Sequence, residues 1–84
     1  MLDYLGTVFA GSSDLEISVG EAEILPSGES YINFQLYNDG DCHISINGGD
    51  YIFIRAKQGI DISRAMSIKI YEDSITYNWI GVKS

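Results

Sequence analysis

CHISINGGDYIFIRA, residues 42–56, is the stretch that decides the fold, because it contains two alternating runs separated by adjacent glycines. Apolar residues occupy every second position of both runs: Cys42, Ile44, Ile46, Ile52, Ile54 and Ala56. Period two is the side-chain period of a β-strand, and paired glycines between two strands favour a hairpin turn. A three-residue loop over 48–50 would place Ile46 opposite Ile52 and keep one face of the hairpin wholly aliphatic. We therefore expect a β-hairpin in this register.

The same alternation continues before and after this hairpin. Residues 31–37 alternate, with Ile32, Phe34 and Leu36 expected inward, and the turn at 38–41 predicts that they pair with 42–46. Residues 66–70 and 75–79 alternate around a short turn and predict a further hairpin. The expected core consists of the inward residues of these runs: Phe34, Leu36, Ile44, Ile46, Ile52, Ile54, Ile68, Ile70, Tyr77 and Trp79.

Short strands, frequent turns and no convincing helix predict an all-β protein, a small antiparallel β-sandwich or jelly-roll-like domain. The 84 residues suit one domain over 1–84, with 1–13 as an N-terminal arm or an edge strand. Within 15–19 the apolar residues alternate with Glu16 and Ser18, which predicts a half-exposed strand. The first residues have neither the charge nor the apolar length of a secretory signal or a membrane span.

Charge is distributed unevenly along the chain. Residues 1–54 contain nine acids and no Lys or Arg, whereas 55–84 contain five bases and three acids, which gives a net charge of −7. An acidic surface repels phosphate backbones, so we expect no nucleic-acid partner. The asymmetry is either a solubility device or a means by which an acidic face meets a basic face on a neighbouring copy or a host surface.

Residue types that carry catalysis or hold cofactors are scarce. The one histidine, His43, is adjacent to the one cysteine, Cys42, and alternation places the two on opposite sides of a strand. We expect a buried Cys42, no catalytic residues, no cofactor and no metal, and therefore not an enzyme. The segment 38–41, Asn-Asp-Gly-Asp, has oxygen groups that suit calcium, but the same residues are those of a tight turn, and both interpretations stay open.

The outward face of the predicted strands carries the candidate binding residues. These are Tyr37, His43, Tyr51, Phe53 and Arg55. Aromatic rings among amide, hydroxyl and guanidinium groups can stack on sugar rings or form a protein interface, and they also occur on solvated sheet faces. We interpret this set as a binding surface for protein or carbohydrate.

Two segments, Ile46–Ala56 and Ile75–Gly81, resemble parts of small β-rich virion proteins of tailed bacteriophages, such as head-decoration proteins and the attachment domains of head or tail fibres. The resemblance implies a non-enzymatic structural protein, located in the virion. It also implies assembly in several copies, commonly trimers, or contact with capsid subunits. A carbohydrate-binding β-sandwich module that recognises a cell surface is the alternative from a different class.

Overall fold

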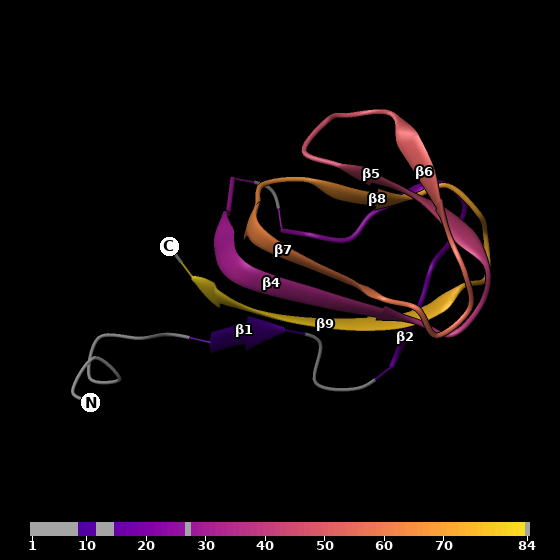
Figure 1. The fold of residues 1–84 in the computed structure, drawn as a ribbon, viewed down its shortest axis with the longest axis horizontal. Coiled ribbons are helices and arrows are strands. Elements are labelled where there is room, and N and C mark those ends of the chain that lie inside the picture. Colours follow the sequence, from indigo (N-terminus) through magenta and orange to yellow (C-terminus); the bar gives the residue numbers. More distant parts are fainter. Residues whose placement is uncertain (1–8, 12–14, 27, 84) are drawn as a thin grey trace.

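The computed structural model describes residues 9–11, 15–26 and 28–83, which form two antiparallel sheets packed face to face (Figure 1). Within these residues there are strands and no helix, so the predicted all-β sandwich is confirmed. The strands are β1 (Phe9–Gly11), β2 (Glu16–Ile17), β3 (Ala22–Glu23), β4 (Tyr31–Asn38), β5 (Cys42–Ile46), β6 (Tyr51–Ile54), β7 (Ile60–Ala65), β8 (Ile68–Ile70) and β9 (Thr76–Lys83). Of the predicted arm or edge strand at 1–13, residues 9–11 form β1 at a sheet edge, and 1–8 and 12–13 lie outside the described residues.

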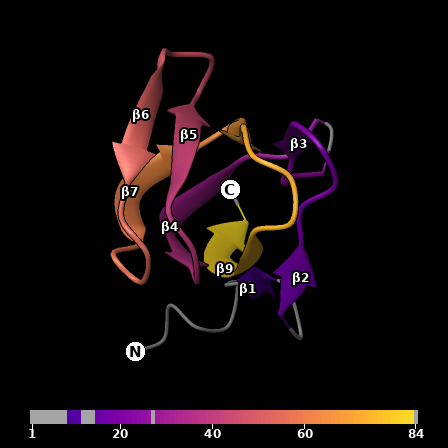
Figure 2. The same ribbon diagram turned by 90° about the vertical axis from the view of Figure 1, so that its right-hand side faces the viewer.

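Each sheet has one edge on each side of the sandwich. Sheet A runs β1-β9-β4-β7, with β2 also paired to β9, and sheet B runs β3-β8-β5-β6. Figure 2 shows β6 and β7 on one side of the sandwich and β2 and β3 on the other. The sandwich therefore has two open sides, one formed by the edge strands β6 and β7 and the other by β2 and β3.

Two of the predicted hairpins are wrong, because their strands lie in different sheets. The segment 39–41 carries the chain from β4 in sheet A to β5 in sheet B, and 71–75 carries it back from β8 to β9. Alternation determines which side of a strand is apolar. That side faces the core whether two consecutive strands form a hairpin in one sheet or lie in the two facing sheets, so alternation does not distinguish these cases. The β4 pairing partners are instead β7 and β9.

The β5–β6 hairpin forms as predicted, but its register differs by two residues. Ile44 lies opposite Ile52 and Cys42 opposite Ile54. The turn begins at Asn47, whose side chain accepts hydrogen bonds from the N–H groups of Met66 and Ser67 and donates one to the Arg64 carbonyl. These partners lie at the end of β7 and in its connection to β8. The sequence of the hairpin alone therefore could not predict where its turn begins. The shift is even, so the isoleucines still share one face.

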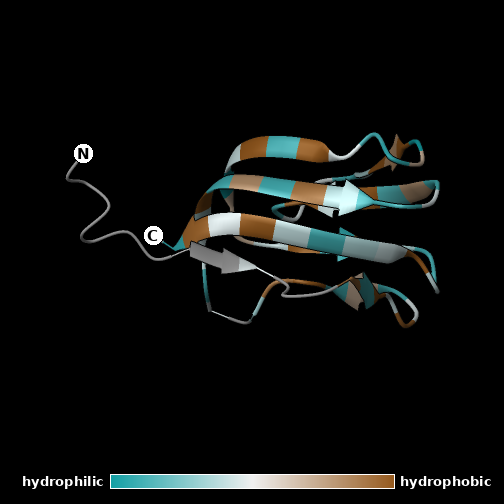
Figure 3. Cartoon of the chain, turned by 90° about the horizontal axis from the view of Figure 1, so that it is seen from below, coloured by the Kyte–Doolittle hydropathy of each residue, from teal (hydrophilic) through white to brown (hydrophobic). Residues whose placement is uncertain are grey.

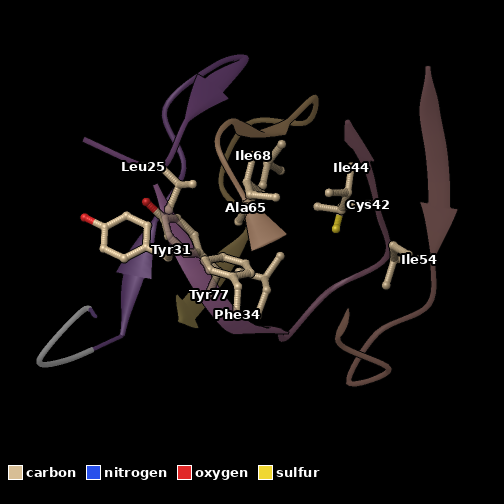
Figure 4. Packing of buried hydrophobic residues seen from close by; sticks show 11 residues of the cluster. Leu25, Tyr31, Phe34, Cys42, Ile44, Ile54, Ala65, Ile68 and Tyr77 are labelled. Carbon is tan, nitrogen blue, oxygen red and sulfur yellow. The ribbon is translucent and has the colours of Figure 1, made fainter. Parts of the chain in front are cut away.

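The core lies between the sheets, and Figure 4 shows its side chains gathered there. Its buried apolar members are Leu25, Tyr31, Phe34, Leu36, Cys42, Ile44, Ile54, Ala65, Ile68, Ile70 and Tyr77. Ile46 and Trp79 are partly buried against this cluster. The predicted core residue Ile52 is 47% exposed, so that prediction is wrong.

Strict alternation with inward Phe34 and Leu36 would point Tyr31 outward, but Tyr31 is almost fully buried. The pairing of β4 with β9 shifts between Ile32 and Gln35, where Asn33 adopts a positive φ of 51°. This bulge reverses the alternation and turns Tyr31 inward, where its ring meets that of Trp79 at 5.0 Å. Figure 3 shows the remaining hydrophobic and hydrophilic alternation along the long strands.

Candidate functional site

The structure divides the predicted binding residues between two opposite faces. His43, Tyr51 and Phe53 lie together on β5 and β6, on the outer face of sheet B. Tyr37 lies on β4, on the outer face of sheet A, and Arg55 follows β6 in the link to β7. The expected pairing of 31–37 with 42–46 would bring Tyr37 beside His43, but β4 and β5 belong to different sheets and the two residues lie on opposite faces.

Two pairs of rings lie on the outer face of sheet B, and we call them together the aromatic surface: His43 with Phe53, and Tyr51 with Tyr71. His43 is directly opposite Phe53, with ring centroids 5.4 Å apart. On the other side of His43, the Tyr71 N–H donates to its carbonyl at 3.0 Å, which places Tyr71 beside it. Phe53 is 54% and Tyr71 58% exposed, so large apolar area faces solvent.

Tyr51 on β6 contacts Tyr71, which follows β8, across the intervening strand β5. It lies opposite Ser45, a small residue, and its ring meets Tyr71 edge-on with centroids 5.3 Å apart. Its hydroxyl donates to the Glu21 carboxylate, and this hydrogen bond together with partial desolvation raises the pKa of Tyr51 to about 12. Tyr51 therefore stays a neutral hydrogen-bond donor in a fixed orientation over the physiological pH range.

Glu72 fixes the position of His43. One Glu72 oxygen accepts the backbone N–H of His43 at 2.7 Å, and the other lies 2.6 Å from its ring Nδ1. Partial desolvation of the carboxylate favours its neutral form, but the hydrogen bonds from His43 outweigh this effect and lower the pKa of Glu72. His43 is thus held by two contacts at the centre of the aromatic surface.

Cys42 lies on the opposite face of β5 from His43 and is buried, as predicted. Burial, reinforced by the negative charge of Glu72, raises the pKa of the Cys42 thiol to about 11. The thiolate is the reactive form, so this cysteine behaves as a small core residue.

A shallow groove of about 740 Å³ lies against sheet A and the link between β6 and β7. It is lined by Gly11, Gln35, Leu36, Tyr37, Lys57, Gln58, Gly59, Ile60, Asp61, Asn78, Trp79 and Ile80. Gln35 on β4 lies opposite Asp61 on β7 and opposite Ile80 on β9. An amide, a carboxylate and an aliphatic group therefore lie side by side across the three strands. We call this the Tyr37 groove.

Tyr71, Glu21 and Glu72 belong to the site but were not among the predicted residues. Tyr71 has a sequence signal, since it follows Ile68 and Ile70 at an outward position of the same alternation. Glu21 and Glu72 have none, because each lies in a connection whose path is set by the rest of the fold.

The residues of segment 38–41 use their polar groups within the protein. The Asn38 amide donates to the carbonyls of Gly40 and Arg55, and an Asp41 oxygen accepts the Ala56 N–H. Across the described part of the chain, no group of three His, Cys, Asp or Glu side chains is placed to hold a metal ion. Nor does that part contain a helix long and apolar enough to cross a membrane.

Comparison with known proteins gives no relative by which to assign this arrangement. No protein-family model, curated protein or solved structure matches the chain.

Proposed function

We propose that this protein is a non-enzymatic structural component of a phage virion, which decorates a capsid or anchors a fibre through protein–protein contacts. The aromatic surface is the observation that carries the proposal. Phe53 and Tyr71 offer apolar area, while Tyr51 and His43 are already fixed by Glu21 and Glu72. Side chains that are fixed before binding lose little entropy on association, which is a property of protein interfaces with aromatic anchors.

The contacts of His43 and Cys42 within the described residues are consistent with the non-enzymatic part of the proposal. His43 is engaged with Glu72, and Cys42 points into the core with a raised thiol pKa. The similarity of Ile46–Ala56 and Ile75–Gly81 to virion protein segments supports the structural part. Both segments include strands of the sandwich, β6 and β9, on different sheets.

Labelling of virus particles tests this proposal. An antibody against the purified chain, applied to density-purified particles from cells that produce the protein, should mark a fixed position on the capsid or fibre. A Phe53→Ala, Tyr71→Ala double variant should lose incorporation, because each truncation of an interface aromatic commonly weakens binding about tenfold or more. Particles that contain no copies of the wild-type chain would rule the proposal out.

Carbohydrate binding is the second candidate, and the Tyr37 groove is the observation that favours it. The hydroxyl of Tyr37 donates to Asp39, which orients the ring beside the exposed amide of Gln35 and the carboxylate of Asp61. Rings stack on sugar faces, and amide and carboxylate groups bond sugar hydroxyls. A glycan array with the whole chain should give a specific hit that Tyr37→Ala abolishes and the Phe53→Ala, Tyr71→Ala variant retains. An array without hits would exclude this candidate.

A further inference from the structure

Residues 15–19 present their apolar side chains to solvent instead of to the core. Leu15, Ile17 and Val19 are 59%, 62% and 83% exposed, whereas Ser18 between them is buried. The Ser18 hydroxyl donates to the Glu72 carbonyl and accepts the Ile75 N–H, each at 2.8 Å. Because these bonds hold Ser18 inward, alternation forces its apolar neighbours outward. We call residues 15–19 the donor edge.

The donor edge is also acidic. Glu16 is exposed on β2 and Glu23 on β3, and these two strands lie on the same side of the sandwich (Figure 2). Asp73 accepts the Gly20 N–H directly after the donor edge, and among the described residues the cation beside these acids is Lys69 on β8, opposite Glu23. Strand β2 pairs only with β9, and its other backbone edge faces none of the described strands. Exposed apolar residues along an open strand edge are an association site unless charge or cover prevents it.

The opposite side of the sandwich has matching properties. There Ile52 on β6 is 47% exposed although it points inward, and Ile60 and Ile62 on β7 are only partly buried. Three exposed cations belong to the link and to β7 on this side: Arg55, Lys57 and Arg64. The acids nearby are Asp61 on β7 and Asp41, which accepts the Ala56 N–H of the link. We call this side the acceptor edge.

We propose that the donor edge of one copy docks on the acceptor edge of a second copy, head to tail, with Leu15, Ile17 and Val19 covering Ile52 and extending sheet A beyond β7. This inference rests on the proposed structural function and specifies its assembly mode. The partner is a second copy because the two edges are complementary in both properties: each has uncovered apolar residues, one is acidic and the other basic. Two donor edges would instead bring like charges together.

Head-to-tail contact leaves one free edge of each kind at the ends of an open assembly. Such contacts close into a ring where the rotation per subunit permits it, and otherwise give a filament. A closed ring of a few copies would suit a symmetric capsid or fibre position.

A mixing experiment tests this geometry with the whole chain. Ile17→Lys disables the donor edge and keeps the acceptor edge, whereas Ile52→Asp does the reverse. Both positions are exposed, so circular dichroism should show folded proteins. In sedimentation velocity at up to about 1 mM, wild type should form oligomers, each variant alone should be monomeric, and their equimolar mixture should form dimers, since one intact interface remains. Asn33→Asp, which adds a carboxylate on the exposed bulge of β4, should assemble like wild type.

Other outcomes overturn the inference. Monomeric wild type, variants that assemble normally, or a mixture that stays monomeric would each exclude the head-to-tail contact. If any of these is found while the chain is incorporated in virus particles, the assembly mode is wrong and the structural function stands. Raising salt from about 0.05 to 0.5 M, which shortens the screening length from about 14 to 4 Å, should weaken wild-type assembly; an unchanged oligomer would count against the charge complementarity.

Discussion

Replacing Asn38 with alanine should destabilise the protein more than its small size suggests. Asn38 is fully buried at the end of β4, and its amide makes three hydrogen bonds to backbone groups. It donates to the carbonyls of Gly40 and Arg55 at 2.9 Å and accepts the Gly59 N–H at 2.8 Å. The side chain thus ties the β4–β5 crossing to the 55–59 link, which carries part of the Tyr37 groove and of the acceptor edge.

The magnitude follows from those three bonds. A typical intramolecular hydrogen bond contributes about 1 kcal/mol net, so Asn38→Ala should cost about 3 kcal/mol, and more if the abandoned backbone groups find no water. A domain of 84 residues has a total stability of about 4–13 kcal/mol at ordinary values per residue. The loss is therefore a large share of the whole.

Urea unfolding followed by tryptophan fluorescence measures this loss, because Trp79 packs on Phe34 in the core. With a slope of about 1–1.5 kcal/mol/M, the midpoint should fall by about 2–3 M. Gln35→Ala is the matched control, an exposed position of the same strand, and should change the stability by less than about 0.5 kcal/mol. A cost below about 1 kcal/mol for Asn38→Ala would refute the assignment of a structural tie.

Three further expectations concern the core and the aromatic surface. Ile44→Ala should cost about 2–5 kcal/mol in urea unfolding, whereas Ile52→Ala, directly opposite but half exposed, should cost less than about 1.5 kcal/mol; equal losses would contradict the burial of the pair. The lowered pKa of Glu72 means that its contribution is present above pH 4.5 and is lost as the pH falls through the folded-state value, so the stability difference between wild type and Glu72→Gln should shrink from about pH 6 to pH 3. In absorbance titration at alkaline pH, Tyr51 should ionise near its pKa of about 12, and Glu21→Gln should bring that pKa toward 10; no change would mean that Glu21 is not its partner.

The sequence predicted the fold class well because period-two alternation is a local property of each strand. It identified the segments of β4, β5, β6 and β8 and the first half of β9. Seven of the ten expected core residues are buried: Phe34, Leu36, Ile44, Ile54, Ile68, Ile70 and Tyr77. Topology was the weaker part. A three-residue connection such as 39–41 can close a hairpin or cross between sheets, and the alternation of the flanking strands is identical in the two cases.

The candidate site was predicted in part for the same reason. His43, Tyr51 and Phe53 were correctly placed on one face, since they belong to one hairpin whose parity is robust to the register error. Tyr37 was grouped with them only through the predicted β4–β5 pairing, which the structure replaces. Arg55 lies just beyond β6, in the link by which the chain leaves sheet B.

The donor edge illustrates the deeper limit of alternation. The alternation of Leu15, Ile17 and Val19 with polar residues predicts that these three side chains share one side of the strand. The apolar side of a strand is usually the buried one. Here the polar residue Ser18 points inward instead. Its hydroxyl pairs with the Glu72 carbonyl and the Ile75 N–H, and leaving these backbone groups unpaired near the core would be costly. Three exposed aliphatic residues are costly for an isolated monomer and reasonable for a subunit. The hydrogen bonds of Ser18 account for the inverted alternation, and the proposed contact with the acceptor edge of a second copy would cover the three exposed side chains.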